Sequence, residues 1–173
     1  MVQILIDSEG DLFIPEVEEG VSWQTDRFGT PGTLKFSIPK ENIGRFEEGD
    51  HVALQIDGKD IFYGFVFTKK SSGKSDMVEV TAYDQLRYLK NKDTYVYEDK
   101  TAGDLIRMLA ADFQLQTGEI EDTGFRIASR VEDNSTLFDI VQNALDLTLT
   151  NTGQMYVLFD DYGKLALKNI SHM

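Results

Sequence analysis

The sequence predicts a strand-rich α+β fold, with an antiparallel strand domain in the first half and a small α+β domain in the second. Apolar residues alternate with a period of two up to about residue 83, and recur at helical spacing after residue 101. The composition, 41% hydrophobic and 11% aromatic, is that of a globular protein. A length of 173 residues suits one domain or two small ones.

The first half contains several short runs of high β-propensity. Strands are expected at residues 2–6, 20–25, 32–38, 52–56, 60–68 and 77–83. In the run 32–38, Leu34, Phe36 and Ile38 share one face, and Asp57-Gly58 is a hairpin turn signal between two of the strands. About six strands without a long helix predict a small antiparallel barrel or sandwich.

The strand expected at 60–68 is apolar on both faces. It carries Phe62, Tyr63, Phe65 and Phe67, so both faces should be buried. Burial in the core alone and burial in the core plus contact with another subunit both explain this pattern. Gly64 in the middle of the strand indicates a bulge or a bend.

The second half has helical signals. A short helical stretch is expected at 84–90 and a strand at 95–97. Thr101 and Asp104 have capping-box spacing and precede apolar residues at helical intervals. A second helix is expected from about residue 134 to Gly153, and a final hairpin at 154–159 and 164–168. We therefore expect a strand domain at 1–92, a small α+β domain with two helices at 93–170, and a tail at 171–173 with the character of a cloning remnant.

The formal charge of −13 is spread evenly along the chain, without an acidic tail or a basic stripe. Such a chain should repel nucleic acid and anionic membranes, so we expect neither as a partner. The acidity fits simple solubility, and it also fits a surface along which DNA slides without binding. We expect a soluble protein, because no apolar run approaches the roughly 18 to 20 residues that span a bilayer and the N-terminus does not resemble a secretory signal.

The residues of common catalytic and metal sites are scarce. The chain has no cysteine and only two histidines, His51 and His172, and it lacks Walker A, dinucleotide-binding and nucleophile-elbow motifs. Neighbouring carboxylates such as Glu132 and Asp133 should be solvated and ordinarily ionised. We therefore expect no catalytic residue, no cofactor, no metal and no enzymatic activity.

Several segments, in their order along the chain, form a pattern that points to a particular protein family more specifically than the overall composition does. The run 47–54 reads Glu-Glu-Gly-Asp-His-Val-Ala-Leu, and 61–66 reads Ile-Phe-Tyr-Gly-Phe-Val. The pattern continues through 81–89, 91–97, 118–124, 145–148 and 156–159. Together these segments resemble baseplate hub proteins of contractile phage tails, in particular the XkdQ/YqbQ-like family of PBSX-type and skin-element prophages in Firmicutes.

The resemblance implies a structural role in a phage tail or phage-like particle. Hub proteins of this kind form a trimeric ring of tube-like barrels that connects the tail tube to the spike, so the implied partners are tube, spike and tape-measure proteins. The first half would be such a barrel, and 93–170 an inserted domain. Because family members are about twice as long, we expect a fragment that lacks a second barrel, with a homotrimer in the full-length form. The implied location is the bacterial cytoplasm during assembly, then the particle.

Candidate contacts between subunits are Trp23, Phe62, Phe65 and Phe67, because interfaces are enriched in aromatic residues. Two alternatives belong to other functional classes. Residues 95–97 followed by 101–106 superficially resemble a peptidoglycan-binding LysM module, and the many carboxylates would be the catalytic groups of a cell-wall hydrolase.

Overall fold

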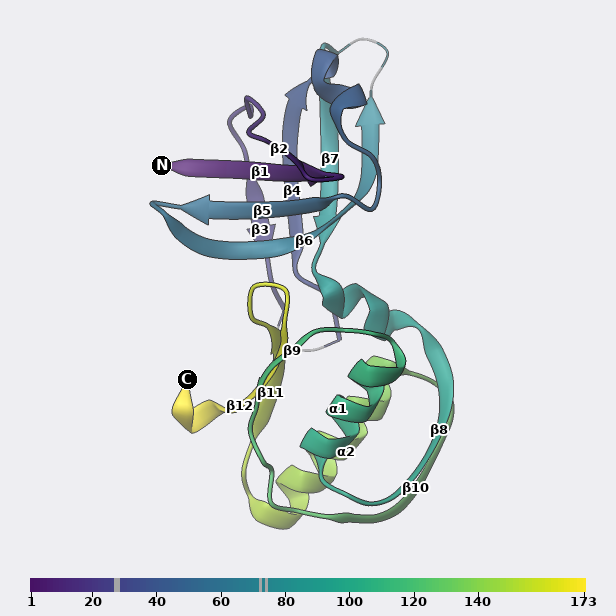
Figure 1. Ribbon diagram of the computed structural model, residues 1–173. Coiled ribbons are helices and arrows are strands. Elements are labelled where there is room, and N and C mark those ends of the chain that lie inside the picture. Colours follow the sequence, from purple (N-terminus) through teal and green to yellow (C-terminus); the bar gives the residue numbers. More distant parts are fainter. Residues whose placement is uncertain (27–28, 72, 74) are drawn as a thin grey trace. The chain divides into compact units, whose positions relative to one another are not determined.

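The chain divides into two compact units (Figure 1). The computed structural model describes residues 1–26, 29–71, 73 and 75–173. The first unit, here the strand unit, consists of Met1–Asp26 and Pro31–Gln85, and the second, the mixed unit, mainly of Leu86–Met173. The sequence analysis placed the division at residue 92. In the structure it falls earlier because Leu86 and Leu89 are buried in the second hydrophobic core.

One antiparallel sheet forms the strand unit. Its elements are β1 (Val2–Ser8), β2 (Asp11–Phe13), β3 (Ser22–Gln24), β4 (Thr33–Pro39), the 3-10 helix η1 (Lys40–Arg45), β5 (His51–Ile56), β6 (Lys59–Ser71) and β7 (Met77–Tyr83). The strands lie in the order β2-β1-β5-β6-β7-β4-β3. The long β6 runs beside β5 and then beside β7, so it joins the two halves of the sheet (Figure 1).

The period of two along these strands directs their apolar residues into one core. Leu34, Phe36 and Ile38 on β4 are all buried, as their shared face predicts. The β5–β6 hairpin turns at Asp57 and Gly58, both with positive φ, which confirms the turn signal in the sequence.

The sheet does not close into a barrel among the described strands. It has two ends, β2 and β3, which pair with β1 and β4 but not with each other. Each of these end strands has only three residues. The antiparallel strand domain is therefore confirmed in the form of an open sheet, and the expected barrel is not.

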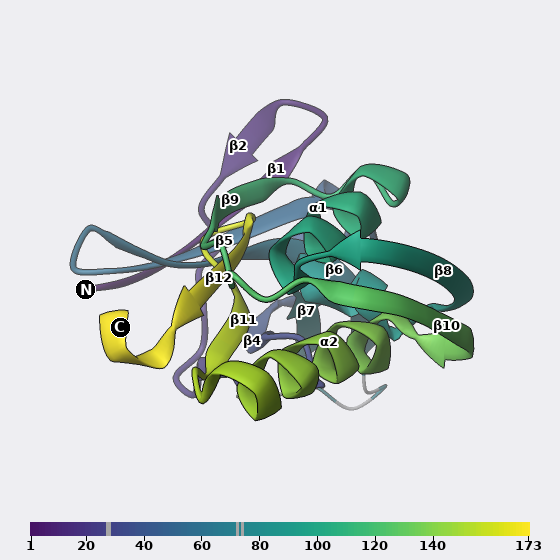
Figure 2. The ribbon, with the colours of Figure 1, turned by 90° about the horizontal axis from the view of Figure 1, so that it is seen from below.

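The mixed unit combines two helices with two small sheets. Its elements are the 3-10 helix η2 (Gln85–Lys90), β8 (Lys92–Lys100), α1 (Ala102–Asp112), β9 (Thr117–Ile120), β10 (Ile127–Thr136), α2 (Leu137–Thr152), β11 (Tyr156–Asp160), β12 (Leu165–Asn169) and the 3-10 helix η3 (Ile170–His172). Strands β8 and β10 form an antiparallel ribbon that curves around α1 and α2 (Figures 1 and 2). In the other sheet β12 pairs with β11 antiparallel and with β9 parallel.

Both helices begin after a threonine cap, and the first begins where the sequence predicted. The Thr101 hydroxyl accepts from the Asp104 backbone N–H at 3.1 Å, and the Asp104 carboxylate accepts from the Thr101 N–H at 3.1 Å, which confirms the capping box. Helix α2 is capped by Thr136 and ends at Gly153, whose φ of 71° is the left-handed conformation common after a helix.

The strand β10 is the main difference from the sequence-based prediction. Its residues do not alternate cleanly, and a second helix was expected from about residue 134, where β10 in fact continues. A register shift between Glu132 and Ser135, with Asn134 at a φ of 47°, carries the strand on to the helix cap. At the C-terminus, where a tail was expected, η3 brings His172 Nδ1 to 3.1 Å from Glu121 Oε1.

Candidate interaction surface

A row of aromatic rings lies on the outer face of the strand unit. On β6, Phe62 and Val66 point into the core, so the alternating residues Tyr63 and Phe65 lie on the opposite face. We define the outer aromatic surface as the rings that gather on this face, from strands β5, β6 and β7: His51, Tyr63, Phe65, Phe67 and Tyr83.

Cross-strand pairing brings these rings together. Phe65 lies directly opposite His51 on β5 and Tyr83 on β7. The His51 ring stacks on Tyr63 with 5.3 Å between centroids and lies 4.8 Å from the Phe65 ring. The Phe67 ring meets Tyr83 edge to face at 5.1 Å. The surface is therefore one contiguous aromatic cluster that crosses three strands.

Gly64 allows β6 to pass this close to β7. A Cβ atom at this position would lie 2.3 Å from the Tyr83 carbonyl oxygen and 2.7 Å from the Phe62 ring. The sheet also has a register shift between Val66 and Thr68, which leaves Phe67 outside the regular pairing. The sequence indicated a bulge or a bend at Gly64; in the structure this glycine is regularly paired with Val52 and marks a close backbone approach, and the bulge lies further along β6.

Carboxylates lie beside the outer aromatic surface. Asp7 on β1 is the cross-strand neighbour of His51. Burial, with a smaller contribution from the negative charge of Asp7, raises the pKa of the Tyr63 hydroxyl. A hydrogen bond from the Ser8 side chain, aided by one from the Glu47 backbone N–H, lowers the pKa of Asp50. The rings thus form an apolar area with the carboxylates of Asp7 and Asp50 next to it.

The four candidate interface residues fall in three different environments. Phe65 and Phe67 belong to the outer aromatic surface, and Phe67 is 46% exposed. Phe62 is buried in the core of the strand unit. Trp23 is 45% exposed on β3, but it pairs with the inward-facing Leu34 and so lies on the other side of the sheet.

His51 and Tyr83 are not connected with this surface by their sequence context. His51 directly precedes the strand expected at 52–56, and Tyr83 is the last residue of the strand expected at 77–83. The signal that connects them is the pairing register of three strands, which a single strand's alternation does not contain.

No group of three or more metal-binding side chains is found among the described residues. One carboxylate differs from the expectation of solvated acids. Glu132 is buried, accepts from Arg130 Nε and Nη2 at 3.1 and 3.0 Å, and accepts from Asn143 Nδ2 at 3.1 Å. These contacts match the buried charge with donors from β10 and α2, so they tie the ribbon to the helix.

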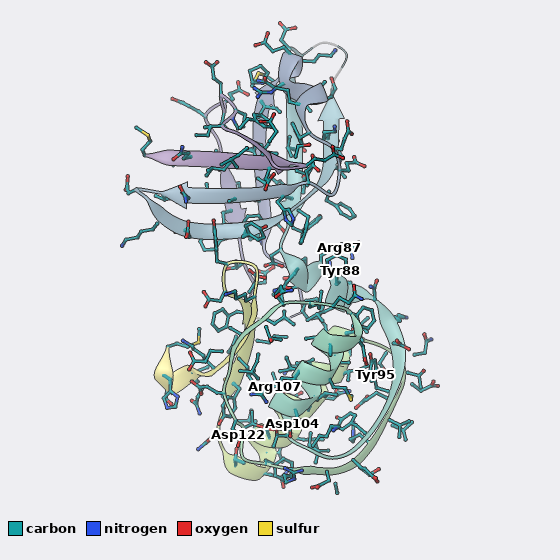
Figure 3. All side chains as sticks on the ribbon, viewed as in Figure 1. Arg87, Tyr88, Tyr95, Asp104, Arg107 and Asp122 are labelled. Carbon is teal, nitrogen blue, oxygen red and sulfur yellow. The ribbon has the colours of Figure 1, made fainter. Side chains whose placement is uncertain are left out.

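Other polar contacts of the mixed unit also join its elements to one another. Arg107 and Asp104 lie on α1 (Figure 3). Arg107 Nη2 donates to the Ile120 carbonyl oxygen at 2.7 Å, and the Tyr95 hydroxyl is 2.9 Å from Asp112 Oδ2. These residues hold β8, α1 and β9 in place.

The topology of the mixed unit differs from the order expected for a LysM module. Strand β8 is followed by α1, and its pairing partner β10 comes before α2. A LysM module closes with a strand after its second helix, whereas here the strand after α2, β11, pairs with β12 and not with β8. Within the described ranges, no helix is both long and apolar enough to cross a membrane.

Comparison with known proteins supplies the wider context. The profile of the YQBQ-like family matches residues 21–173. The chain is 35% identical over 174 aligned residues to "Uncharacterized protein YqbQ" of Bacillus subtilis, and 33% identical to "Phage-like element PBSX protein XkdQ" of the same organism. These alignments cover 97% of the chain and 52% and 53% of the relatives, so the chain spans about half their length.

The fold is also that of a solved phage protein. The 43 kDa tail protein of prophage MuSo2 from Shewanella oneidensis aligns with a TM-score of 0.73 at 13% identity. The alignment covers 96% of this chain and 52% of that protein. At this identity the likeness concerns the fold alone, and it includes elements of both units.

Proposed function

Because the chain belongs to the YQBQ-like family, we propose that it is a structural component of a phage tail or phage-like particle. More specifically, we propose that it is part of a baseplate hub, the ring that connects the tail tube to the spike. The observation that carries the proposal is the 33% identity, over 97% of the chain, to the phage-like element PBSX protein XkdQ, and the likeness of the fold to a prophage tail protein agrees with it.

In this proposal the strand unit is the part that builds the ring. The chain spans about half of its curated relatives, and the remaining half would supply a second domain of the same kind. The full-length form would be a homotrimer whose partners are tube, spike and tape-measure proteins. It would assemble in the bacterial cytoplasm and then reside in the particle.

The outer aromatic surface is the proposed contact between subunits. Large aromatic side chains contribute much of the binding energy at protein interfaces, and Phe65 and Phe67 both neighbour Tyr83 outside the core. Trp23 is proposed as a separate contact, because it is exposed on the other side of the sheet.

Light scattering tests this proposal on a protein of the relatives' full length and on the present chain. We expect a trimer for the long form, and dissociation of that trimer by the double substitution F65S/F67S. The matched control is Val96→Ser, since Val96 is 69% exposed on β8 in the mixed unit. A long form that stays monomeric at high concentration would contradict the ring.

We propose a role without catalysis. The rival functions have direct tests: saturable binding of the chain to purified peptidoglycan would favour a wall-binding module. A cleared zone on a cell-wall zymogram, lost on one carboxylate-to-amide substitution, would favour a hydrolase.

A further inference from the structure

The hairpin formed by β1 and β2 presents two aliphatic side chains to solvent. Leu12 on β2 is 61% exposed, and Ile14, directly after β2, is 57% exposed. Phe13 between them is buried in the core of the strand unit, so the residues on either side of it face away from that core. Side chains two positions apart in an extended chain are neighbours on one face, so Leu12 and Ile14 form one apolar area, the hairpin surface.

Contacts on both sides of the sheet hold this hairpin in place. The N–H of Gly10, in the turn, donates to Asp7 Oδ1 at 2.9 Å. On the inner side, the Phe13 ring lies 6.0 Å from the Phe46 ring, and the Arg45 guanidinium lies 4.2 Å from the centre of the Phe13 ring. A hairpin that is already fixed loses little conformational entropy when it binds, which favours association.

Acidic residues surround the hairpin surface. Although the two halves of the sequence are similarly acidic, residues 1–26 contain seven Asp and Glu and no Lys or Arg, so this segment carries −7 of the total charge of −13. Glu9 and Asp11 precede the hairpin surface and Glu16 follows it, and all three are exposed. The hairpin therefore combines an apolar centre with an acidic rim.

This combination selects a partner of opposite charge. A second copy of the chain carries the same −13 and would be repelled. Nucleic acid and anionic membranes would be repelled as well. A groove on a protein, with an apolar floor and Lys or Arg along its rim, complements both the aliphatic side chains and the acids.

From these observations we propose that the β1–β2 hairpin docks into an apolar groove with a basic rim on another protein. Leu12 and Ile14 fill the groove, and the three acids face its rim. Leu12 shares a face of the sheet with the outer aromatic surface, but Asp7 lies between Leu12 and His51 in the pairing of the strands. The inference goes beyond the proposed hub role and does not depend on a trimer.

Methyl NMR of the complete 173-residue chain tests this proposal. The probe is a blocked helical peptide with leucine on one face and lysine along both borders of that face. We expect saturable shifts of the Leu12 and Ile14 methyl signals. The double substitution L12T/I14T should weaken binding about tenfold, because it removes apolar area but keeps the β-propensity of the strand. Trp23 fluorescence during urea denaturation should show that the strand unit still folds.

The matched control is V96T/V131T, the same kind of change at two exposed aliphatic residues of the mixed unit. Val96 is 69% exposed and Val131 is 67% exposed, and they are paired across β8 and β10. The control should leave the affinity for the peptide unchanged, because the proposal assigns binding to the hairpin surface and not to every exposed aliphatic pair.

A charge variant tests the acidic rim. The double substitution E9Q/E16Q should weaken binding several-fold at low salt, whereas E41Q/E98Q, at two exposed acids outside the hairpin, should leave it unchanged. The difference should vanish at 1 M salt, where the screening length is about 3 Å.

Four outcomes would overturn the proposal. They are the absence of saturable shifts, equal weakening by the threonine substitutions in the hairpin and in the ribbon, equal effects of the two charge variants, and binding of the chain to uncharged phosphatidylcholine vesicles that L12T/I14T abolishes. The last result would assign the hairpin surface to a membrane instead of a protein groove.

Discussion

The two units of the molecule satisfy their polar groups in different ways. In the mixed unit, charged side chains pair with nearby partners, such as Arg126 with Asp99 at 2.7 Å and Lys168 with Glu119 at 3.2 Å. Its helix ends are capped by residues adjacent in sequence. The strand unit instead has an unpaired stretch of edge at β1 and a cluster of rings on its outer face.

The comparison indicates where the molecule is suited to make contacts. The mixed unit completes its helix caps and several ion pairs internally, although its two-stranded ribbon also has open edges among the described strands and exposes Val96 and Val131. An open sheet edge and an aromatic face both gain free energy when another chain covers them. The strand unit is the part in which aromatic rings gather on the outer face of a sheet.

The largest expected effect is the loss of packing in the core of the mixed unit. Leu105 is fully buried on α1, so Leu105→Ala should lower the free energy of unfolding of that unit by about 3 kcal/mol. Circular dichroism at 222 nm reports α1 and α2 during urea denaturation. Leu149→Ala, at a half-exposed position on α2, is the control and should cost much less. Equal losses would contradict the assigned core.

A somewhat smaller effect is expected at Gly64 in the strand unit. A methyl group there would meet the Tyr83 carbonyl, so Gly64→Ala should destabilise this unit by about 2 kcal/mol. Trp23 is the sole tryptophan, and its fluorescence reports this unit alone. Gly44→Ala is the control, because an added Cβ at Gly44 meets no atom within 4 Å. If Gly64→Ala shifted the unfolding midpoint measured by circular dichroism as much as the midpoint measured by Trp23 fluorescence, the two units would unfold together.

The capping box should contribute less than either core. Thr101→Ala removes the hydroxyl that accepts from the Asp104 N–H, and should cost about 1 kcal/mol at the helical transition. Thr101→Ser keeps the acceptor and should retain most of the stability. If the serine variant were as unstable as the alanine variant, the cap would not be the cause.

The pH dependence of Asp104 gives a small effect with a defined sign. The hydrogen bond from the Thr101 N–H, aided by the Thr101 hydroxyl and Arg107, holds the pKa of Asp104 below its ordinary value of 3.8. Since the folded state lowers this pKa, the contribution is present above pH 3.8 and is lost as the pH falls through the lowered value. Asp104→Asn should weaken the pH dependence of the unfolding free energy that circular dichroism at 222 nm reports. The same change of unfolding free energy between pH 5 and 2 in both proteins would contradict this.

The smallest effect on stability is expected at the outer aromatic surface. Phe67 is 46% exposed and meets the Tyr83 ring edge to face, so Phe67→Ser should lower the unfolding free energy of the strand unit by at most about 1 kcal/mol. The matched substitution Phe62→Ser, in the core, should be severely destabilising. Similar unfolding midpoints for the two variants would contradict the assigned faces of β6.

Local signals in the sequence predicted much of the fold. The capping box at Thr101, the Asp57-Gly58 turn and the alternation along β4 each depend on residues close together, and each is confirmed. Strand β10 was missed because its pairing with β8 joins residues 27 to 44 positions apart and its residues do not alternate cleanly. Closure of a barrel is likewise a long-range property, and the three-residue end strands do not achieve it.

The candidate surface shows the same limit. Counting back from the Asp57-Gly58 turn pairs Ile56 with Lys59 and Gln55 with Asp60, and would place His51 opposite Gly64. The register shift next to Gln55 moves Phe65 into that position instead. Alternation along one strand was therefore enough to identify Phe65 and Phe67. Predicting that His51 lies opposite Phe65 would also have required the position of the bulge, which alternation does not reveal.

The central claim is that the strand unit carries the contacts between chains. Hydroxyl-radical footprinting of the full-length form, free and assembled, tests it most directly. We predict protection of Phe65 and Phe67 on assembly, with no change at Tyr162, an exposed aromatic residue of the mixed unit. Protection of Tyr162 with Phe65 and Phe67 still reactive would contradict the claim.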